Sequence, residues 1–115
     1  KRLSKVLKTF CYRHIYRNRD VLGLELQGFN TITGLMDIFW EAINDCEDNG
    51  KNASPYSIYV FERISENYRR VYNEAIIAGE LPVRYCRFQL MTDMLAGMTD
   101  TYAVTTFEDL KQRRN

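Results

Sequence analysis

The chain has 115 residues, 45% of them hydrophobic and 13% aromatic, and its 16 basic residues nearly balance 15 acidic ones. This length and apolar content predict one domain around a single core and exclude an intrinsically disordered chain. No apolar run approaches the ~20 residues that cross a bilayer, and no signal peptide opens the chain. The three cysteines are widely spaced and do not make a secreted disulfide framework. We therefore expect a cytoplasmic protein.

Apolar residues recur at helical spacing along almost the whole chain, which predicts an all-α fold of five to six helices in one domain, residues 1–115. The first helix is expected from Arg2 to Ile15, with a break at residues 16–19. Asp20 is a candidate N-cap for a long second helix from Val21 to about Cys46. The predicted apolar face of the first helix comprises Leu3, Val6, Leu7, Phe10 and Cys11, with Lys1, Lys5 and Lys8 on the other face.

Turn and capping signals separate the remaining helices. After a polar loop, Ser54-Pro55 combines a cap residue with a proline suited to a first helical turn. Ser65 is a second candidate cap, Gly97 marks the end of a long helix, and Thr105-Thr106-Phe107-Glu108 has the spacing of a capping box. We expect these helices at residues 56–64, 65–77 and 83–95, followed by a short one after residue 105.

Basic residues concentrate at the amino end: residues 1–20 carry seven basic groups and one acid, Asp20. Two interpretations are open, a solvated helix face or a surface that binds the phosphates of a nucleotide or of single-stranded nucleic acid. Tyr12 and Tyr16 lie between the arginines, a pattern that suits base stacking.

The sequence offers little material for catalysis. His14 is the one histidine, and no cysteines or histidines stand at metal-ligand spacing. We interpret His14 as an exposed helix residue. Cysteines and methionines on apolar helix faces are interpreted as core packing, namely Cys11, Cys86, Met91, Met94 and Met98.

Two stretches resemble bacterial deoxyguanosine triphosphate triphosphohydrolases, which are HD-domain phosphohydrolases. One contains Glu25-Leu-Gln-Gly28 and continues to Asp37; the other, residues 91–103, contains Gly97-Met-Thr-Asp100-Thr-Tyr102-Ala. The resemblance covers nearly the whole chain and implies an enzyme that cuts a deoxynucleoside triphosphate into deoxynucleoside and tripolyphosphate. It also implies a divalent metal, Mg or Mn, bound by histidines and aspartates N-terminal to this region. His14 is followed by Ile15 rather than by Asp, so we expect a C-terminal fragment that is inactive alone.

The same resemblance implies two substrate-binding residues. Tyr16 corresponds to an aromatic residue at the base pocket, and Glu25 to an acid that lines the nucleotide pocket. A carboxylate can accept from the N1–H and N2–H donors of guanine, and a buried carboxylate left unpaired is costly, so the site can reject other bases. The alternatives are core packing for Tyr16 and an exposed helix position for Glu25. Asp100 and Tyr102 are interpreted as structural.

The leading hypothesis is therefore the C-terminal helical region of a dGTP triphosphohydrolase, contributing nucleoside-pocket and subunit contacts. Its expected partners are dGTP or another deoxynucleotide, the N-terminal HD part of the same protein, and further copies in a homo-oligomer. In some relatives the loop that corresponds to residues 47–57 is basic and contacts DNA. Here the loop is mildly acidic, so the resemblance gives less reason to expect that contact. The alternative is a non-catalytic helical module whose basic first helix binds single-stranded nucleic acid or a protein partner.

Overall fold

The computed structural model describes residues 5–19 and 26–114, with side chains described at 5–15 and 28–114. The predicted all-α class is confirmed: the described residues form six α-helices and one short 3₁₀ turn, with no strand among them. In chain order the elements are α1 (Lys5–Arg19), α2 (Leu26–Asn49), η1 (Gly50–Asn52), α3 (Pro55–Glu62), α4 (Glu66–Ala78), α5 (Val83–Ala96) and α6 (Asp100–Arg114).

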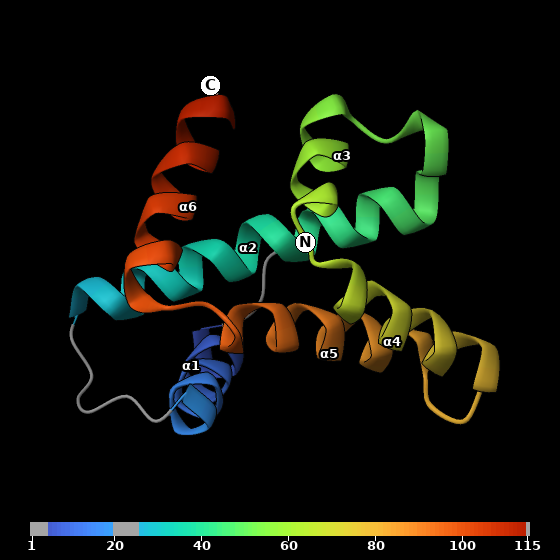
Figure 1. Ribbon diagram of the computed structural model, residues 1–115, viewed down its shortest axis with the longest axis horizontal. Helices are drawn as coiled ribbons and strands as arrows, with labels where there is room; N and C mark the ends of the chain where they lie inside the picture. Colours follow the sequence, from blue (N-terminus) through green and yellow to red (C-terminus); the bar gives the residue numbers. More distant parts are fainter. Residues whose placement is uncertain (1–4, 20–25, 115) are drawn as a thin grey trace.

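Helix α2 lies across the middle of the molecule, and most other helices pack against it (Figure 1). Helices α3 and α6 stand on one side of α2, α1 and α5 lie on the other, and α4 packs on α5. Apolar residues of α2 repeat at helical spacing and are fully buried, so this helix supplies the centre of the core. The most deeply buried of them are Ile32, Leu35, Met36, Phe39 and Ile43.

The predicted apolar face of the first helix is wrong in part: Cys11 is buried, but Val6, Leu7 and Phe10 are exposed, and Leu3 lies outside the described residues. Val6 is 81% exposed and Phe10 is 66% exposed, whereas Lys8 lies toward α2 and its Nζ forms an ion pair with Asp37 Oδ2 at 2.8 Å. Two sets of apolar residues on this helix have helical spacing. The set that contacts the core lies beside the ion pair, and the set with Val6 and Phe10 is exposed. The buried side chains of α1 are Cys11, Tyr12 and Ile15. The expected break at residues 16–19 is also wrong, because α1 continues to Arg19.

Two serine caps and the helix end at Gly97, which follows the last residue of α5, are confirmed. The Ser54 side chain accepts a hydrogen bond from the Ser57 N–H at 3.1 Å, and Pro55 occupies the first turn of α3. The Ser65 hydroxyl accepts from the Asn67 N–H at 3.3 Å and starts α4. Gly79 ends α4 with a φ of 69°, a left-handed conformation that glycine adopts without strain.

The expected start of the last helix is wrong. Helix α6 begins at Asp100, and the predicted capping box from Thr105 to Glu108 lies inside it. The hydroxyl that serves the first turn belongs to Thr99, which accepts from the Tyr102 N–H at 3.1 Å. A threonine that can cap a helix occurs twice within a few residues, at Thr99 and Thr105, and the one nearer to Gly97 starts the helix. The proposed Asp20 cap and Val21 start of the second helix lie outside the described residues.

Helices α2 and α6 approach closely at Gly34. A Cβ atom on Gly34 would overlap the ring of Phe107, so the missing side chain lets that ring lie directly on α2. Glycine lowers helix propensity, but here it permits the contact between the first half of α2 and the middle of α6. No described helix is both long enough and apolar enough to cross a membrane.

Candidate functional site

The two predicted substrate-binding residues fall, in the sequence, at the end of α1 and in the stretch before α2. The backbone of Tyr16 belongs to α1, but its side chain, like all of Glu25, lies outside the described residues. On either side of this stretch, Tyr12 and Phe29 pack edge to face with ring centroids 4.9 Å apart. Edge-to-face pairs of this kind are favourable contacts. The pair joins α1 to α2 one helical turn before residue 16 and one turn after residue 25.

An ion pair lies at the same junction. Lys8 Nζ donates to Asp37 Oδ2 at 2.8 Å, and both side chains are largely buried. The second oxygen, Asp37 Oδ1, is buried and finds no hydrogen-bond donor among the described residues. A buried carboxylate without a donor costs free energy. Lys8 supplies the hydrogen bond to Oδ2 and therefore stays at this position as the partner of Asp37. Lys8 is therefore not part of a solvated basic face.

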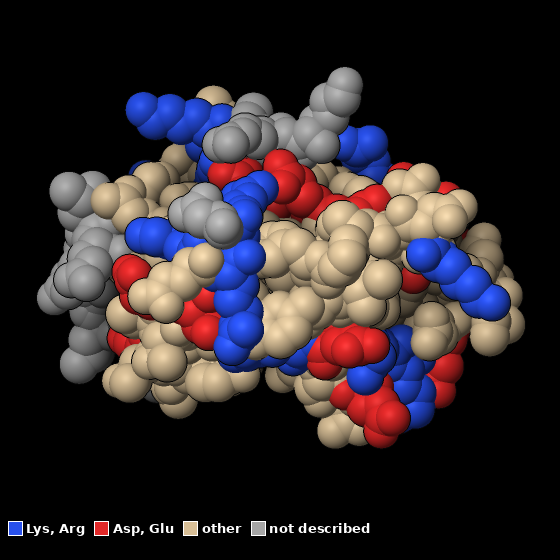
Figure 2. Space-filling model, turned by 90° about the horizontal axis from the view of Figure 1, so that it is seen from above, with Lys and Arg blue, Asp and Glu red and all other residues tan. Residues whose placement is uncertain are grey.

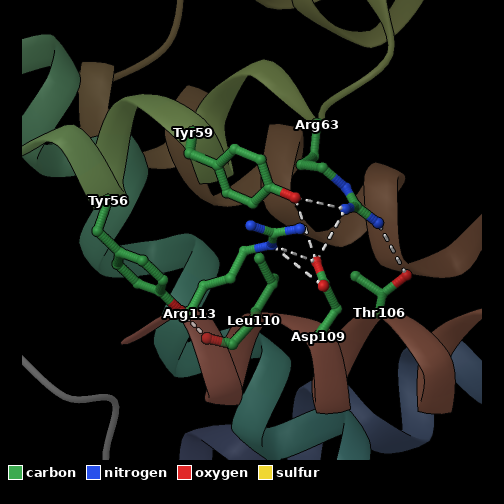
Figure 3. A network of polar contacts seen from close by, with 7 residues as sticks. All are labelled: Tyr56, Tyr59, Arg63, Thr106, Asp109, Leu110 and Arg113. Carbon is green, nitrogen blue, oxygen red and sulfur yellow. Dashed lines mark hydrogen bonds and ion pairs between the residues drawn. The ribbon is translucent and has the colours of Figure 1, made fainter. Parts of the chain in front are cut away.

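The densest polar network joins α3 to α6 (Figure 3). At its centre, Asp109 Oδ2 accepts hydrogen bonds from the Tyr59 hydroxyl and from Arg63 Nη1, both at 3.2 Å. Arg113 Nε donates to Asp109 Oδ1 at 3.1 Å, and the Arg113 guanidinium lies 4.9 Å from the centroid of the Tyr59 ring. One carboxylate thus lies between two guanidinium groups.

Further contacts extend this network along both helices. The Tyr56 hydroxyl donates to the Leu110 carbonyl at 2.8 Å, and Arg63 Nη2 donates to Thr106 Oγ1 at 3.5 Å. Burial raises the pKa of the Tyr56 hydroxyl, which therefore stays protonated and keeps donating. This arrangement fastens α3 to α6 and contains no acid–base pair suited to proton transfer. The sequence analysis missed it, although Tyr59–Arg63 and Asp109–Arg113 both have the i, i+4 spacing that brings side chains together on a helix.

A second polar group joins α2 to α4 and α5. Arg87 Nη1 donates to Asn44 Oδ1 at 2.8 Å, and Arg87 Nη2 donates to Asp48 Oδ1 at 3.0 Å. The Tyr72 hydroxyl donates to Glu47 Oε1 at 2.9 Å, and burial together with this bond raises the pKa of Tyr72 to about 12. These partners are far apart in the sequence, and no local pattern predicts their contact.

The predicted polar loop after α2 is fastened by a carboxylate. Asp45 Oδ2 accepts from the Ser54 N–H at 3.0 Å, and Asp45 Oδ1 accepts from Asn49 Nδ2 at 2.6 Å. The bond from the Ser54 N–H is the main cause that lowers the pKa of Asp45 below its ordinary value. The one basic residue of the loop, Lys51, is exposed.

Several side chains occupy the structural positions expected for them. His14 is exposed on α1, as predicted. The cysteines and methionines interpreted as core residues are buried, and burial raises the pKa of the Cys11 thiol to about 11. Asp100 and Tyr102 lie in the first turn of α6. Within residues 5–19 and 26–114, no three His, Cys, Asp or Glu side chains lie close enough together to hold a metal ion.

An apolar cavity opens between α1 and α5, beside Trp40 of α2. It has a volume of about 370 Å³ and is lined by Leu7, Trp40, Pro82, Arg84, Tyr85 and Phe88. Its lining is mostly apolar, and Arg84 is the one charged residue among the described residues that form it. Such a cavity can hold apolar groups by shape, but it contains no nucleophile or general base.

Similarity to known proteins agrees with the motifs. The chain is 30% identical over 124 aligned residues to a deoxyguanosinetriphosphate triphosphohydrolase of Serratia proteamaculans, covering 94% of this chain and 25% of the relative. Relatives of the same name from Cronobacter sakazakii (31% identical, 95% of this chain and 25% of the relative) and Salmonella typhimurium (32% identical, 89% and 23%) match similarly. No family model and no solved structure matches. The resemblance inferred from residues 20–37 and 91–103 is therefore confirmed along most of the chain, which spans about a quarter of the length of these curated relatives.

Proposed function

We propose that these 115 residues are the C-terminal helical region of a metal-dependent deoxynucleoside triphosphate triphosphohydrolase that converts dGTP and water to deoxyguanosine and tripolyphosphate. The observation that carries this proposal is the similarity to deoxyguanosinetriphosphate triphosphohydrolases over 94% of the chain. The compact all-α architecture supports it, because the resemblance implies a helical C-terminal part.

In this proposal the hydrolytic centre lies in the HD part of the protein, N-terminal to residue 1. The resemblance assigns Mg²⁺ or Mn²⁺ to that part. A divalent ion bound there can polarise the attacking water and neutralise the polyphosphate. The fragment by itself is expected to be inactive, and its contributions are the shape of the nucleoside pocket and contacts within a homo-oligomer.

The nucleoside pocket is proposed at the junction of α1 and α2, with Tyr16 at the base and Glu25 as the acceptor for the guanine N1–H and N2–H donors. The Tyr12–Phe29 contact supports this placement, since it brings the two helices together on either side of both residues. A carboxylate has two acceptor oxygens and no donor, which matches the adjacent donors of guanine and not the pattern of adenine.

The reaction is tested on the full-length protein. It is incubated separately with each of the four deoxynucleoside triphosphates and Mg²⁺ or Mn²⁺, and inorganic tripolyphosphate is measured. Tripolyphosphate from dGTP supports the proposal. Release of pyrophosphate alone, or of no product, contradicts it.

The role of Glu25 has a separate test with a matched control. Glu25→Gln in the full-length protein replaces one acceptor oxygen by a donor, so kcat/KM for dGTP should fall relative to the other three substrates. Glu80→Gln makes the same chemical change in the exposed turn between α4 and α5 and should leave the preference unchanged. An unaltered preference in Glu25→Gln would remove this residue from base recognition.

The alternative, a nucleic-acid-binding module, receives less support from the geometry. Lys8, one of the basic residues counted on the first helix, is engaged by Asp37. On the side of the molecule where α6 ends, away from α1 (Figure 1), both basic and acidic side chains reach the surface (Figure 2). If the protein does bind an oligonucleotide through several phosphates, its affinity should fall steeply with salt concentration. A flat salt response, or no binding, would remove this alternative.

A further inference from the structure

Helix α1 presents apolar side chains on the side that faces away from the core. Val6 and Phe10 are 81% and 66% exposed, and their i, i+4 spacing places them next to each other on one face of the helix. Large apolar side chains scattered singly on a surface need no explanation, but neighbouring ones beside an apolar cavity indicate an interaction site. We call this pair the α1 stripe.

The α1 stripe is continuous with the cavity between α1 and α5. Leu7 lines that cavity, and its i, i+3 spacing from Phe10 places the two side chains next to each other on the helix surface, so Leu7 links the stripe to the cavity. The floor of the cavity is aromatic: Trp40 and Phe88 pack edge to face with centroids 5.7 Å apart, and the Arg84 guanidinium lies 5.6 Å from the Trp40 ring centroid. Tyr85, half exposed, forms part of its rim. Together the stripe and cavity form one docking face, with a buried aromatic floor and an exposed apolar edge.

We propose that this docking face is covered by the HD part of the same polypeptide, which contacts it through apolar side chains flanked by an acidic one. The acid is expected because Arg84 is the one charged residue among the described residues that line the cavity, and no carboxylate stands beside it in that described lining. This inference rests on the proposed function, since it takes the HD part to be joined to the chain at its amino end.

Two observations favour this occupant over a second copy of the chain. The curated relatives are about four times as long as the chain, so most of the polypeptide in proteins of this kind lies outside these 115 residues. On the proposed function, that polypeptide enters directly before α1, only a few residues from Val6 and Phe10. A segment tethered so close to the face has a high effective concentration there, which a separate subunit does not have.

The test is photo-crosslinking in the full-length protein. Phe10 is replaced by the photoreactive analogue p-benzoylphenylalanine, and Val6 by the same analogue in a second variant in case the first does not fold. Ile77, which is 85% exposed at the far end of α4 from α1, receives the analogue as the matched control (Figure 1). Equal amounts of ¹⁴N- and ¹⁵N-labelled protein are dissociated and reassembled together before irradiation, so that any oligomer contains both labels. Mass spectrometry then identifies each crosslinked peptide.

The expected result is a crosslink from position 10 or 6, and not from position 77, to a peptide outside residues 1–115 that carries the same isotope label. Mixed-isotope crosslinks would overturn the proposal, because the face would then belong to a subunit interface. Absence of any crosslink from both positions in folded protein would overturn it as well, since the face would be open to solvent. The readout needs no enzymatic activity, so it remains valid even if tripolyphosphate release fails and the proposed function is abandoned.

Discussion

The network between α3 and α6 predicts a large effect of one isosteric substitution, Asp109→Asn. The change keeps the shape and removes the negative charge that lies between Arg63 and Arg113. The Arg63–Asp109 pair is about one quarter to one third exposed, and hydrogen bonds to charged groups contribute ~1.5–3 kcal/mol where they are shielded. The Arg113 side chain is 56% exposed, so its pair with Asp109 contributes ~0.5 kcal/mol. We expect Asp109→Asn to lower the free energy of unfolding by about 2 kcal/mol.

The assay is urea unfolding of the 115-residue chain, followed by circular dichroism of its helices. Glu108→Gln is the matched control, because it makes the same carboxylate-to-amide change one residue away. Its partner Lys111 lies 3.7 Å from it, and both side chains are more than half exposed, so the control should change stability by less than ~0.5 kcal/mol. If Asp109→Asn and Glu108→Gln unfold at the same urea concentration, the network does not stabilise the α3–α6 contact and the reasoning is refuted.

Three further predictions concern other parts of the fold. Gly34→Ala should destabilise the chain by ~1–3 kcal/mol through overlap with the Phe107 ring, despite the better helix propensity of alanine, and Phe107→Leu should restore part of the loss in the same urea assay. Because the pKa of Asp45 is lowered mainly by the Ser54 N–H, its contribution to stability is present above the ordinary aspartate pKa of about 4 and is lost as the pH falls through the lowered folded value. Unfolding curves from pH 3 to 6 should therefore depend less steeply on pH in Asp45→Asn, and an unchanged slope would contradict this. The Cys11 thiol is buried and its pKa is raised to about 11, so in the folded chain it should resist a thiol-specific reagent at mildly alkaline pH. It should react once the chain is unfolded in urea. Rapid labelling of Cys11 in the folded chain would contradict this prediction.

The starts of α3 and α4 could be predicted from the sequence alone, because each helix follows a serine that can cap it. Ser54 and Ser65 both serve as caps because a hydroxyl that accepts from a first-turn N–H satisfies a group that the helix leaves unpaired. The start of α6 was not predictable in this way. Thr99 and Thr105 both have suitable chemistry, and the choice depends on where α5 ends against the core, which local sequence does not encode.

The candidate site also has a part that the sequence indicated and a part that it did not. Its predicted residues, Tyr16 and Glu25, came from a resemblance rather than from periodicity, and they lie outside the described side chains. The polar contacts that the structure adds, such as those of Arg87 with Asn44 and Asp48, join positions about 40 residues apart in the chain. Charge and spacing within a short window carry no information about such pairs, because the fold alone brings them together.

The sequence pattern on the first helix is real, but Val6 and Phe10 were wrongly assigned to the core because of an assumption about where apolar area is buried. Assigning an apolar stripe to the core assumes that apolar area is removed from water by the same short chain, since burial of that area is the main favourable contribution. Helix α1 carries two stripes, and the structure buries the one that contains Cys11 and Ile15 while Val6 and Phe10 stay exposed. Such an arrangement is favourable when a further part of the polypeptide covers the second stripe. A helix with apolar residues on two sides is therefore better interpreted as a layer between two packed bodies, and the crosslinking experiment at Phe10 tests that interpretation directly.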